Sequence, residues 1–184
     1  MSNPNGSQMG NTVRPLASSV HRAEFPLTEQ PKLRFAVGMF NSWAQLCDAL
    51  RDLRARGLVL DSFNCLALER VFVGKAIIAP YQKPIAVEVL PFPESPESMA
   101  CTSGPLADCL MERLSSGAQS LKDALGHWLI PRHAAHFHDA VEAGKILFWI
   151  RVVHADQERR AYQSLLARSS NSVGVHDLMP LRER

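Results

Sequence analysis

The chain has 184 residues, 46% of them hydrophobic, so it can bury a substantial core and is predicted to form one globular unit. It carries 20 Lys and Arg residues against 18 Asp and Glu residues, a formal net charge of +2. This balance, without a long basic run, excludes an electrostatic case for nucleic-acid binding.

The cysteines indicate a reducing compartment. Cys47, Cys65, Cys101 and Cys109 have spacings unlike those of a zinc site, and most of them fall in predicted helices or strands. The N-terminus lacks the apolar core of a signal peptide, and no apolar run approaches the ~20 residues that a membrane span needs. We therefore expect a cytoplasmic protein with no membrane partner.

The ends of the chain differ in composition from its centre. Residues 1–31 are rich in Ser, Asn, Gly and Pro and are predicted to be a disordered tail, because they bury too little to offset their ordering entropy. Residues 32–179 are predicted to form a single α+β domain, and 180–184 a short C-terminal tail.

The domain is predicted to open with a strand, a helix and a second strand. The strands are expected at 33–40 (LRFAVGMF) and 63–68, and Asn41 is predicted to cap the helix between them. A crossover this short should be right-handed and place its helix on one face of a sheet. The apolar residues of that helix keep helical spacing: Trp43, Leu46, Cys47, Leu50 and Leu53.

The middle of the chain, about 70–128, is predicted to be an insertion. Residues 85–90 predict a strand, which Pro84 and Pro91 would confine to a sheet edge. The other elements expected here are a proline-containing loop at 92–98 and short helices at 106–114 and 120–128.

The last third is predicted to form helix, strand, helix and strand. Pro131 and Gly144 suit the beginning and end of a helix, and 145–153 (KILFWIRVV) is typical of a central strand covered on both faces. Acidic residues favour another helix beginning near 156, and the alternating residues 172–178 predict a half-buried last strand. The predicted inner stripe of that second helix is Ala161, Tyr162, Leu165 and Leu166.

Two segments resemble the halves of the bacterial general stress protein (heat-induced stress protein) domain. In 35–68 a strand ending in Gly-x-Phe precedes a helix with an Ala/Leu face and a Gly turn. In 130–166 an Ile-Pro helix leads to a glycine, an apolar strand and a helix containing Glu and Ala. The resemblance covers about half of the chain and not its middle. It implies a ferredoxin-like antiparallel sheet with helices on one face, self-association, and no established catalytic residues.

Histidines on the helix after Pro131 are the densest group of potential metal ligands. His133 and His136 are three residues apart, so they could share a metal, and His127 or His176 could fold nearby. The alternative is a solvated helix face.

A second candidate site precedes the helix predicted at 106–114. A thiol at Cys101 could be activated by the helix dipole, and the loop around Ser103 could hold an anion. The alternative is a plain helix entry, with Ser103 as the cap. Trp149 is predicted to be a core residue, or a wall of a ligand pocket between the sheet and the insertion.

No nucleophile, base and acid can be assigned from the sequence, so no enzymatic activity and no cofactor are predicted. Both faces of the strand at 145–153 are apolar, and something apolar must cover the face that carries no helices. The cover could be the sheet of a partner, a ligand, or the inserted segment, which would block dimerisation through the sheet. The expected function is that of a cytoplasmic, stress-associated protein acting as a homodimer or with a protein partner. The alternative is a small-molecule or metal-binding domain, with a pocket walled by Cys101, Trp149, His133 and His136.

Overall fold

The computed structural model describes residues 32–58, 63–73 and 86–178. The tails predicted at the two ends therefore lie outside the described residues. Ile85, where the strand predicted at 85–90 was expected to begin, also lies outside the described residues.

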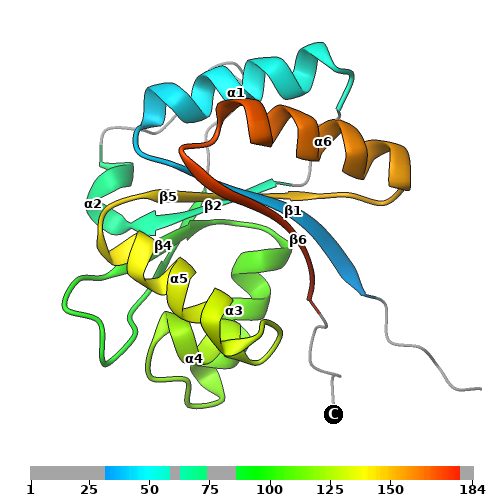
Figure 1. The fold of residues 1–184 in the computed structure, drawn as a ribbon. Helices are drawn as coiled ribbons and strands as arrows, with labels where there is room; N and C mark the ends of the chain where they lie inside the picture. The colour runs from blue at the N-terminus through cyan, green and yellow to red at the C-terminus, as the bar shows by residue number, and fades with distance from the viewer. Residues whose placement is uncertain (1–31, 59–62, 74–85, 179–184) are drawn as a thin grey trace, which may run out of the picture.

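Six strands form one antiparallel sheet in the order β3-β4-β2-β5-β1-β6 (Figure 1). The strands are β1 (Leu33–Phe40), β2 (Phe63–Leu68), β3 (Val87–Leu90), β4 (Met99–Thr102), β5 (Ile146–Arg151) and β6 (Asn171–Leu178). The helices are α1 (Trp43–Ala55), α2 (Glu69–Phe72), α3 (Pro105–Ser115), α4 (Leu121–Gly126), α5 (Pro131–Glu142) and α6 (Ala155–Arg168).

Two β-α-β units make up the side of the sheet that ends at β6. Strands β1 and β2 both run antiparallel to β5, which lies between them, so they are parallel to each other and α1 connects them. In the same way β5 and β6 flank β1 and are connected by α6. Trp149 of β5 lies opposite Val37 of β1 and Asn64 of β2, which fixes the register across these central strands.

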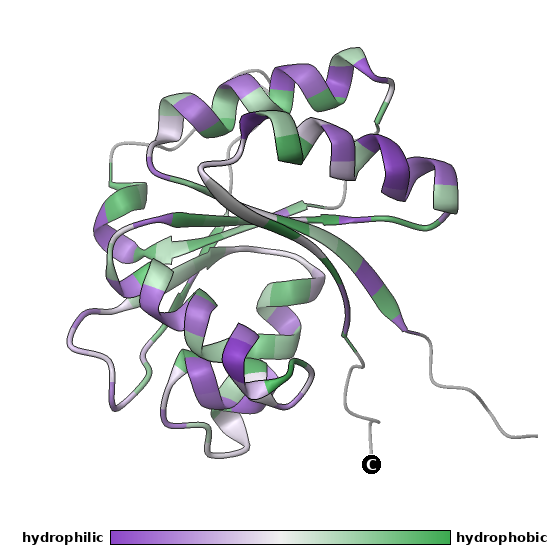
Figure 2. Cartoon of the chain, viewed as in Figure 1, coloured by the Kyte–Doolittle hydropathy of each residue, from purple (hydrophilic) through white to green (hydrophobic). Residues whose placement is uncertain are grey.

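The helices cover both faces of the sheet, so the expectation of helices on one face is wrong. Helices α1 and α6 lie on one face, and α3, α4 and α5 lie on the other (Figure 1). The helices turn polar residues outward, while the strands between the two layers are mainly hydrophobic (Figure 2). A sheet that is apolar on both sides needs such a cover, and here the chain supplies it from its own middle and from α5.

Alternation along the strands divides the buried side chains into two cores. On β5, Leu147 and Trp149 face α3–α5, whereas Phe148 and Ile150 face α1 and α6. This alternation confirms the prediction that strand 145–153 is covered on both sides. The adjoining β2 follows the same rule, with Leu66 in the first core and Cys65 in the second.

The middle of the chain widens the sheet beyond β2. Strand β4 pairs with β2, and β3 pairs with β4 at the edge, as predicted for a proline-flanked strand. Strand β4 was not predicted, because Met99–Thr102 is four buried residues without alternation. Helices α3 and α4 then return across the sheet face.

A buried polar junction joins this middle segment to β2. The Asn64 side chain donates to the Thr102 carbonyl (2.6 Å) and accepts from the Leu106 backbone N–H (3.2 Å). Thr102 Oγ1 in turn accepts from the Cys65 N–H (2.9 Å). Asn64 therefore satisfies an N–H in the first turn of α3 that has no partner within the helix.

The structure corrects two predicted helix caps. Ser42, and not Asn41, caps α1, and its side chain accepts from the Gln45 N–H. At α3 the capping position belongs to Gly104, which has no side chain, so Ser103 does not cap that helix. At α3 the Asn64 side chain, from strand β2, accepts the Leu106 N–H instead. The residues next to α3 in the sequence cannot indicate this contact.

Candidate functional site

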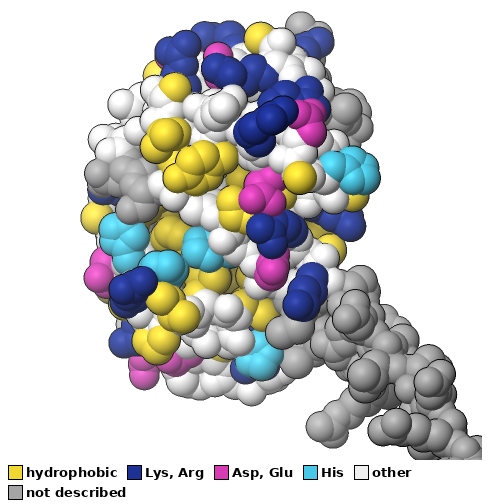
Figure 3. All heavy atoms as spheres, turned by 45° about the vertical axis from the view of Figure 1, so that its right-hand side comes forward, with side chains coloured by type: hydrophobic (Ala, Val, Ile, Leu, Met, Phe, Trp, Pro, Cys, Tyr) yellow, Lys and Arg dark blue, Asp and Glu magenta, His cyan; other side chains and the backbone are white. Residues whose placement is uncertain are grey.

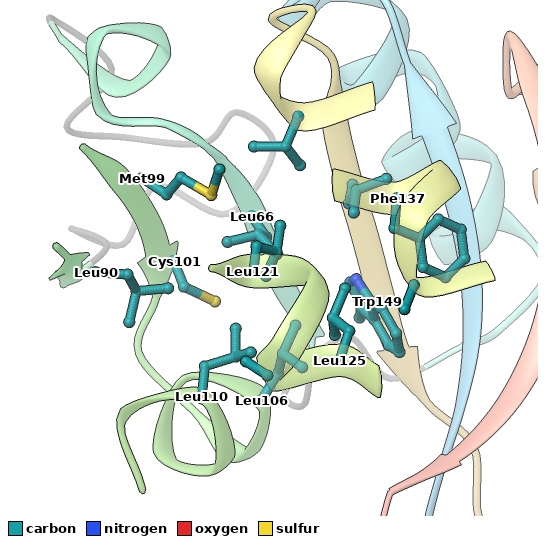
Figure 4. Close-up of a cluster of buried hydrophobic side chains, with 14 of the residues drawn as sticks. Leu66, Leu90, Met99, Cys101, Leu106, Leu110, Leu121, Leu125, Phe137 and Trp149 are labelled. Carbon is teal, nitrogen blue, oxygen red and sulfur yellow. The ribbon is translucent and has the colours of Figure 1, made fainter. Parts of the chain in front are cut away.

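The thiol of Cys101 lies in the core rather than in an open loop. Cys101 lies on β4 and is fully buried, and its side chain points toward Leu106 and Leu110 of α3 (Figure 4). Burial raises the pKa of Cys101 well above its usual value. Ser103 is exposed and its backbone N–H donates to the Ala86 carbonyl (2.9 Å). The geometry thus gives no support to an activated thiol beside an anion loop.

We expect Cys101 to react with a thiol reagent much more slowly than a free model thiol at neutral pH, because the thiolate is both disfavoured and inaccessible. Timed labelling of the native protein, followed by peptide mapping, measures this rate. Labelling of the urea-unfolded protein is the control and should modify all four cysteines rapidly. Fast, selective labelling of native Cys101 would contradict the structure.

Trp149 is fully buried between β1 and α5. Its ring contacts Phe35 (centroids 6.0 Å apart) and Phe137 (5.7 Å) edge-on. The space between the sheet and helices α3–α5 is filled here by apolar side chains, with Trp149, Leu125 and Phe137 close together (Figure 4). Neither Cys101 nor Trp149 therefore presents an open wall to a ligand.

The predicted histidine pair is only partly brought together. His133 and His136 lie on α5, but His136 is exposed and its ring neighbour is Phe137. His133 instead meets His176 of β6, with ring centroids 5.5 Å apart. His127 neighbours Trp128. Within 32–58, 63–73 and 86–178, no three His, Cys, Asp or Glu side chains form a group that could hold a metal.

The surface beside the edge strand β6 combines a groove, exposed apolar side chains and a group of histidines. A groove of about 490 Å³ runs between α6 and β6 and is lined mainly by residues of α6: Ala155, Glu158, Arg159, Tyr162, Gln163, Leu166 and, on β6, Val175. Leu166 is 61% exposed and Tyr162 38% exposed. Hydrophobic side chains gather on this face, with charged side chains and a group of histidines beside them (Figure 3).

Tyr162 and Leu166 were expected to face the core, and the structure corrects this. Helix α6 buries Ala161 and Leu165 against the sheet, while Tyr162 and Leu166, one position further round, form a second column at i and i+4. The apolar stripe of α6 is thus wider than the part of the helix that contacts the sheet. The sequence shows that Tyr162 and Leu166 belong to this stripe, but not that they are exposed.

A charged stripe crosses this surface next to the groove. Arg34 of β1 binds Glu158 of α6 (Nε–Oε2, 2.6 Å) and Asp177 of β6 (Nη1–Oδ1, 3.2 Å). Hydrogen bonding to Glu158 is the main reason that the pKa of Arg34 is raised. These exposed pairs stabilise the fold only slightly, but they tie α6, β1 and β6 together and leave the three side chains with a net charge of −1.

Comparison with known proteins does not assign a family: no family model, no curated protein and no solved structure matches the chain. Among the helices that the structure describes, none has the length and apolar character to cross a membrane. Candidate functions therefore come from the surface of β6 itself.

Proposed function

We propose that this protein acts by self-association, in which β6 of one copy pairs antiparallel with β6 of a second copy. The observation that carries the proposal is an eight-residue edge strand with exposed apolar side chains on the helix beside it. Both sheet faces are covered by helices, so the edges are where a second sheet could pair.

The two edges of the sheet are not equivalent. Strand β3 has four residues and Pro91 follows it directly, which limits what can pair there. Strand β6 has eight residues and contains neither Pro nor Lys, and a register shift interrupts its pairing with β1 between Asn171 and Gly174. Its segment 174–178 pairs in regular register with β1, so the backbone groups on its outer side keep the spacing of an antiparallel ladder.

The apolar column on α6 favours a second copy as the occupant. An antiparallel pair of β6 strands is self-complementary about a twofold axis, the commonest symmetry of homo-oligomers. That axis would bring two α6 helices together, so that Leu166 and Tyr162 of each copy cover the other's groove. Neighbouring exposed apolar residues of this kind mark interaction surfaces.

The charges of the surface are compatible with contact between identical copies. The cation of Arg34 is already matched by Glu158 and Asp177 of its own chain. These three side chains keep a net charge of −1 in each copy, so two copies would meet with only a small repulsion, which salt screens at these exposed positions.

The topology supports the finer fold that the resemblance implies. With the middle segment set aside, β1-α1-β2 and β5-α6-β6 follow the order of a ferredoxin-like core, with α1 and α6 on one face. We infer that the insertion into that core is longer than the predicted 70–128, because α5 also lies between β2 and β5 and on the opposite face from α1 and α6. A stress-associated role rests on the resemblance alone.

The proposal predicts that Leu166→Glu weakens self-association at least about tenfold, roughly 1.4 kcal/mol, because it places a charge in an apolar contact. Sedimentation velocity over a concentration series measures the dimerisation constant. Leu166 is mostly exposed, so the monomer should keep its stability. Ile130→Glu is the matched control: Ile130 is 49% exposed, precedes α5, and should leave the constant unchanged.

Two outcomes would contradict this function. The wild-type protein could remain monomeric at about 100 µM, a concentration above the dissociation constant expected of a specific homodimer. Alternatively, Ile130→Glu could dissociate the dimer while Leu166→Glu leaves it intact, which would place the interface elsewhere.

A further inference from the structure

Two imidazoles from distant parts of the chain meet where α5 contacts the edge strand. His133 lies in the first turn of α5 and His176 lies on β6, with ring centroids 5.5 Å apart and ring planes at 77°. Both side chains are half-buried. On β6, His176 faces the α5 side of the sheet, whereas Val175 faces the groove beside α6.

The ring of His176 is held in place by its surroundings. It contacts Phe137 edge-on (5.5 Å) and lies against Trp149 (6.0 Å). Its Nε2 lies over Gly174, where an added β-carbon would come within 2.8 Å of that nitrogen. The absence of a side chain at Gly174 therefore leaves this nitrogen room that no larger residue would.

A metal ion would bind the ring nitrogens of the two imidazoles in their neutral form, because only that form has a free nitrogen lone pair.

The geometry points to a two-imidazole site at His133 and His176 for a divalent late transition metal such as Zn²⁺. Two imidazoles that share one tetrahedral ion through bonds of about 2 Å have centroids about 5 Å apart, close to the separation here. No third protein ligand completes the set within the described residues, so water would fill the remaining positions. The ion would clip the edge strand β6 to α5, independently of any pairing between copies.

Isothermal titration of the full-length protein with Zn²⁺ tests the site. We expect one saturable ion per chain, with affinity falling at least about tenfold in His133→Gln and in His176→Phe, because each leaves a single imidazole. His176→Phe keeps an aromatic ring against Phe137 and Trp149. His136→Gln is the control, since it removes an exposed histidine of the same helix and should leave affinity unchanged.

Each other result would overturn the site. Absence of saturable Zn²⁺ binding in the wild type would exclude it. Weakening by His136→Gln as large as that by His133→Gln, with His176→Phe unaffected, would move the ion to the helical pair. Thermal unfolding of the metal-free variants checks their fold, and His133→Gln alone decides the matter should His176→Phe fail to fold. Repeating the titration in Leu166→Glu separates metal binding from self-association.

Discussion

Replacing Asn64 by alanine is expected to lower the free energy of unfolding by about 3 kcal/mol, because two buried backbone groups lose their partner at about 1–3 kcal/mol each. These groups are the Leu106 N–H and the Thr102 carbonyl. Asn64 is fully buried, so both groups lie away from the surface. For a chain of this size such a loss is a large fraction of the total stability.

Urea unfolding of the wild type and of Asn64→Ala measures this difference. Asn41→Ala is the control, since Asn41 is exposed at the start of α1 and its loss should change stability by less than about 0.5 kcal/mol. Hydrogen exchange adds a local test: the Leu106 amide should lose protection first in Asn64→Ala. Equal effects of the two substitutions would show that the junction between β2 and α3 contributes little.

Replacing Gly104 by alanine is expected to destabilise the protein by about 2–4 kcal/mol, for two independent reasons. Gly104 has φ 143° and ψ −173°, a region that residues with a β-carbon rarely adopt. In addition, the new β-carbon would lie 2.9 Å from Asn64 Nδ2 and would displace the side chain that caps α3.

Gly126→Ala is a control with the opposite expected sign. Gly126 ends α4, and an added β-carbon there meets nothing within 4 Å. Alanine should therefore be neutral or stabilise the protein by about 0.5 kcal/mol, since it restricts the unfolded chain. Thermal or urea unfolding of both variants gives the comparison, and a Gly104→Ala variant as stable as Gly126→Ala would contradict the geometry.

The two large predictions concern one junction, so their effects should not add. If alanine at 104 already displaces Asn64, then Asn64→Ala costs less in that background than in the wild type. A double-mutant cycle with a coupling energy near zero would mean that Gly104 acts through backbone strain alone.

The core elements of both chain ends could be predicted because their patterns are local. The strand at 63–68 was predicted with the observed bounds, and the strand at 145–153 was placed with its two alternating faces. Pro131 begins α5 and Gly144 follows its end with a positive φ of 81°, as the helix boundary rules predict.

The junction and the surface could not be predicted, because their partners are distant in sequence. Asn64 lies 38 residues from Thr102 and 42 from Leu106, and nothing in the neighbouring residues indicates either contact. The pairing of His133 with His176, in place of His136, likewise depends on how α5 lies beside β6.

The sequence by itself determined where the strands and helices of the two β-α-β units lie, since hydrophobic periodicity and Pro and Gly positions act within a few residues. Only the tertiary structure decided that helices cover both faces of the sheet and that β6 forms an edge. It also decided that Tyr162 and Leu166 stay exposed, because burial depends on which elements pack together, and the same apolar stripe can face a core or a partner.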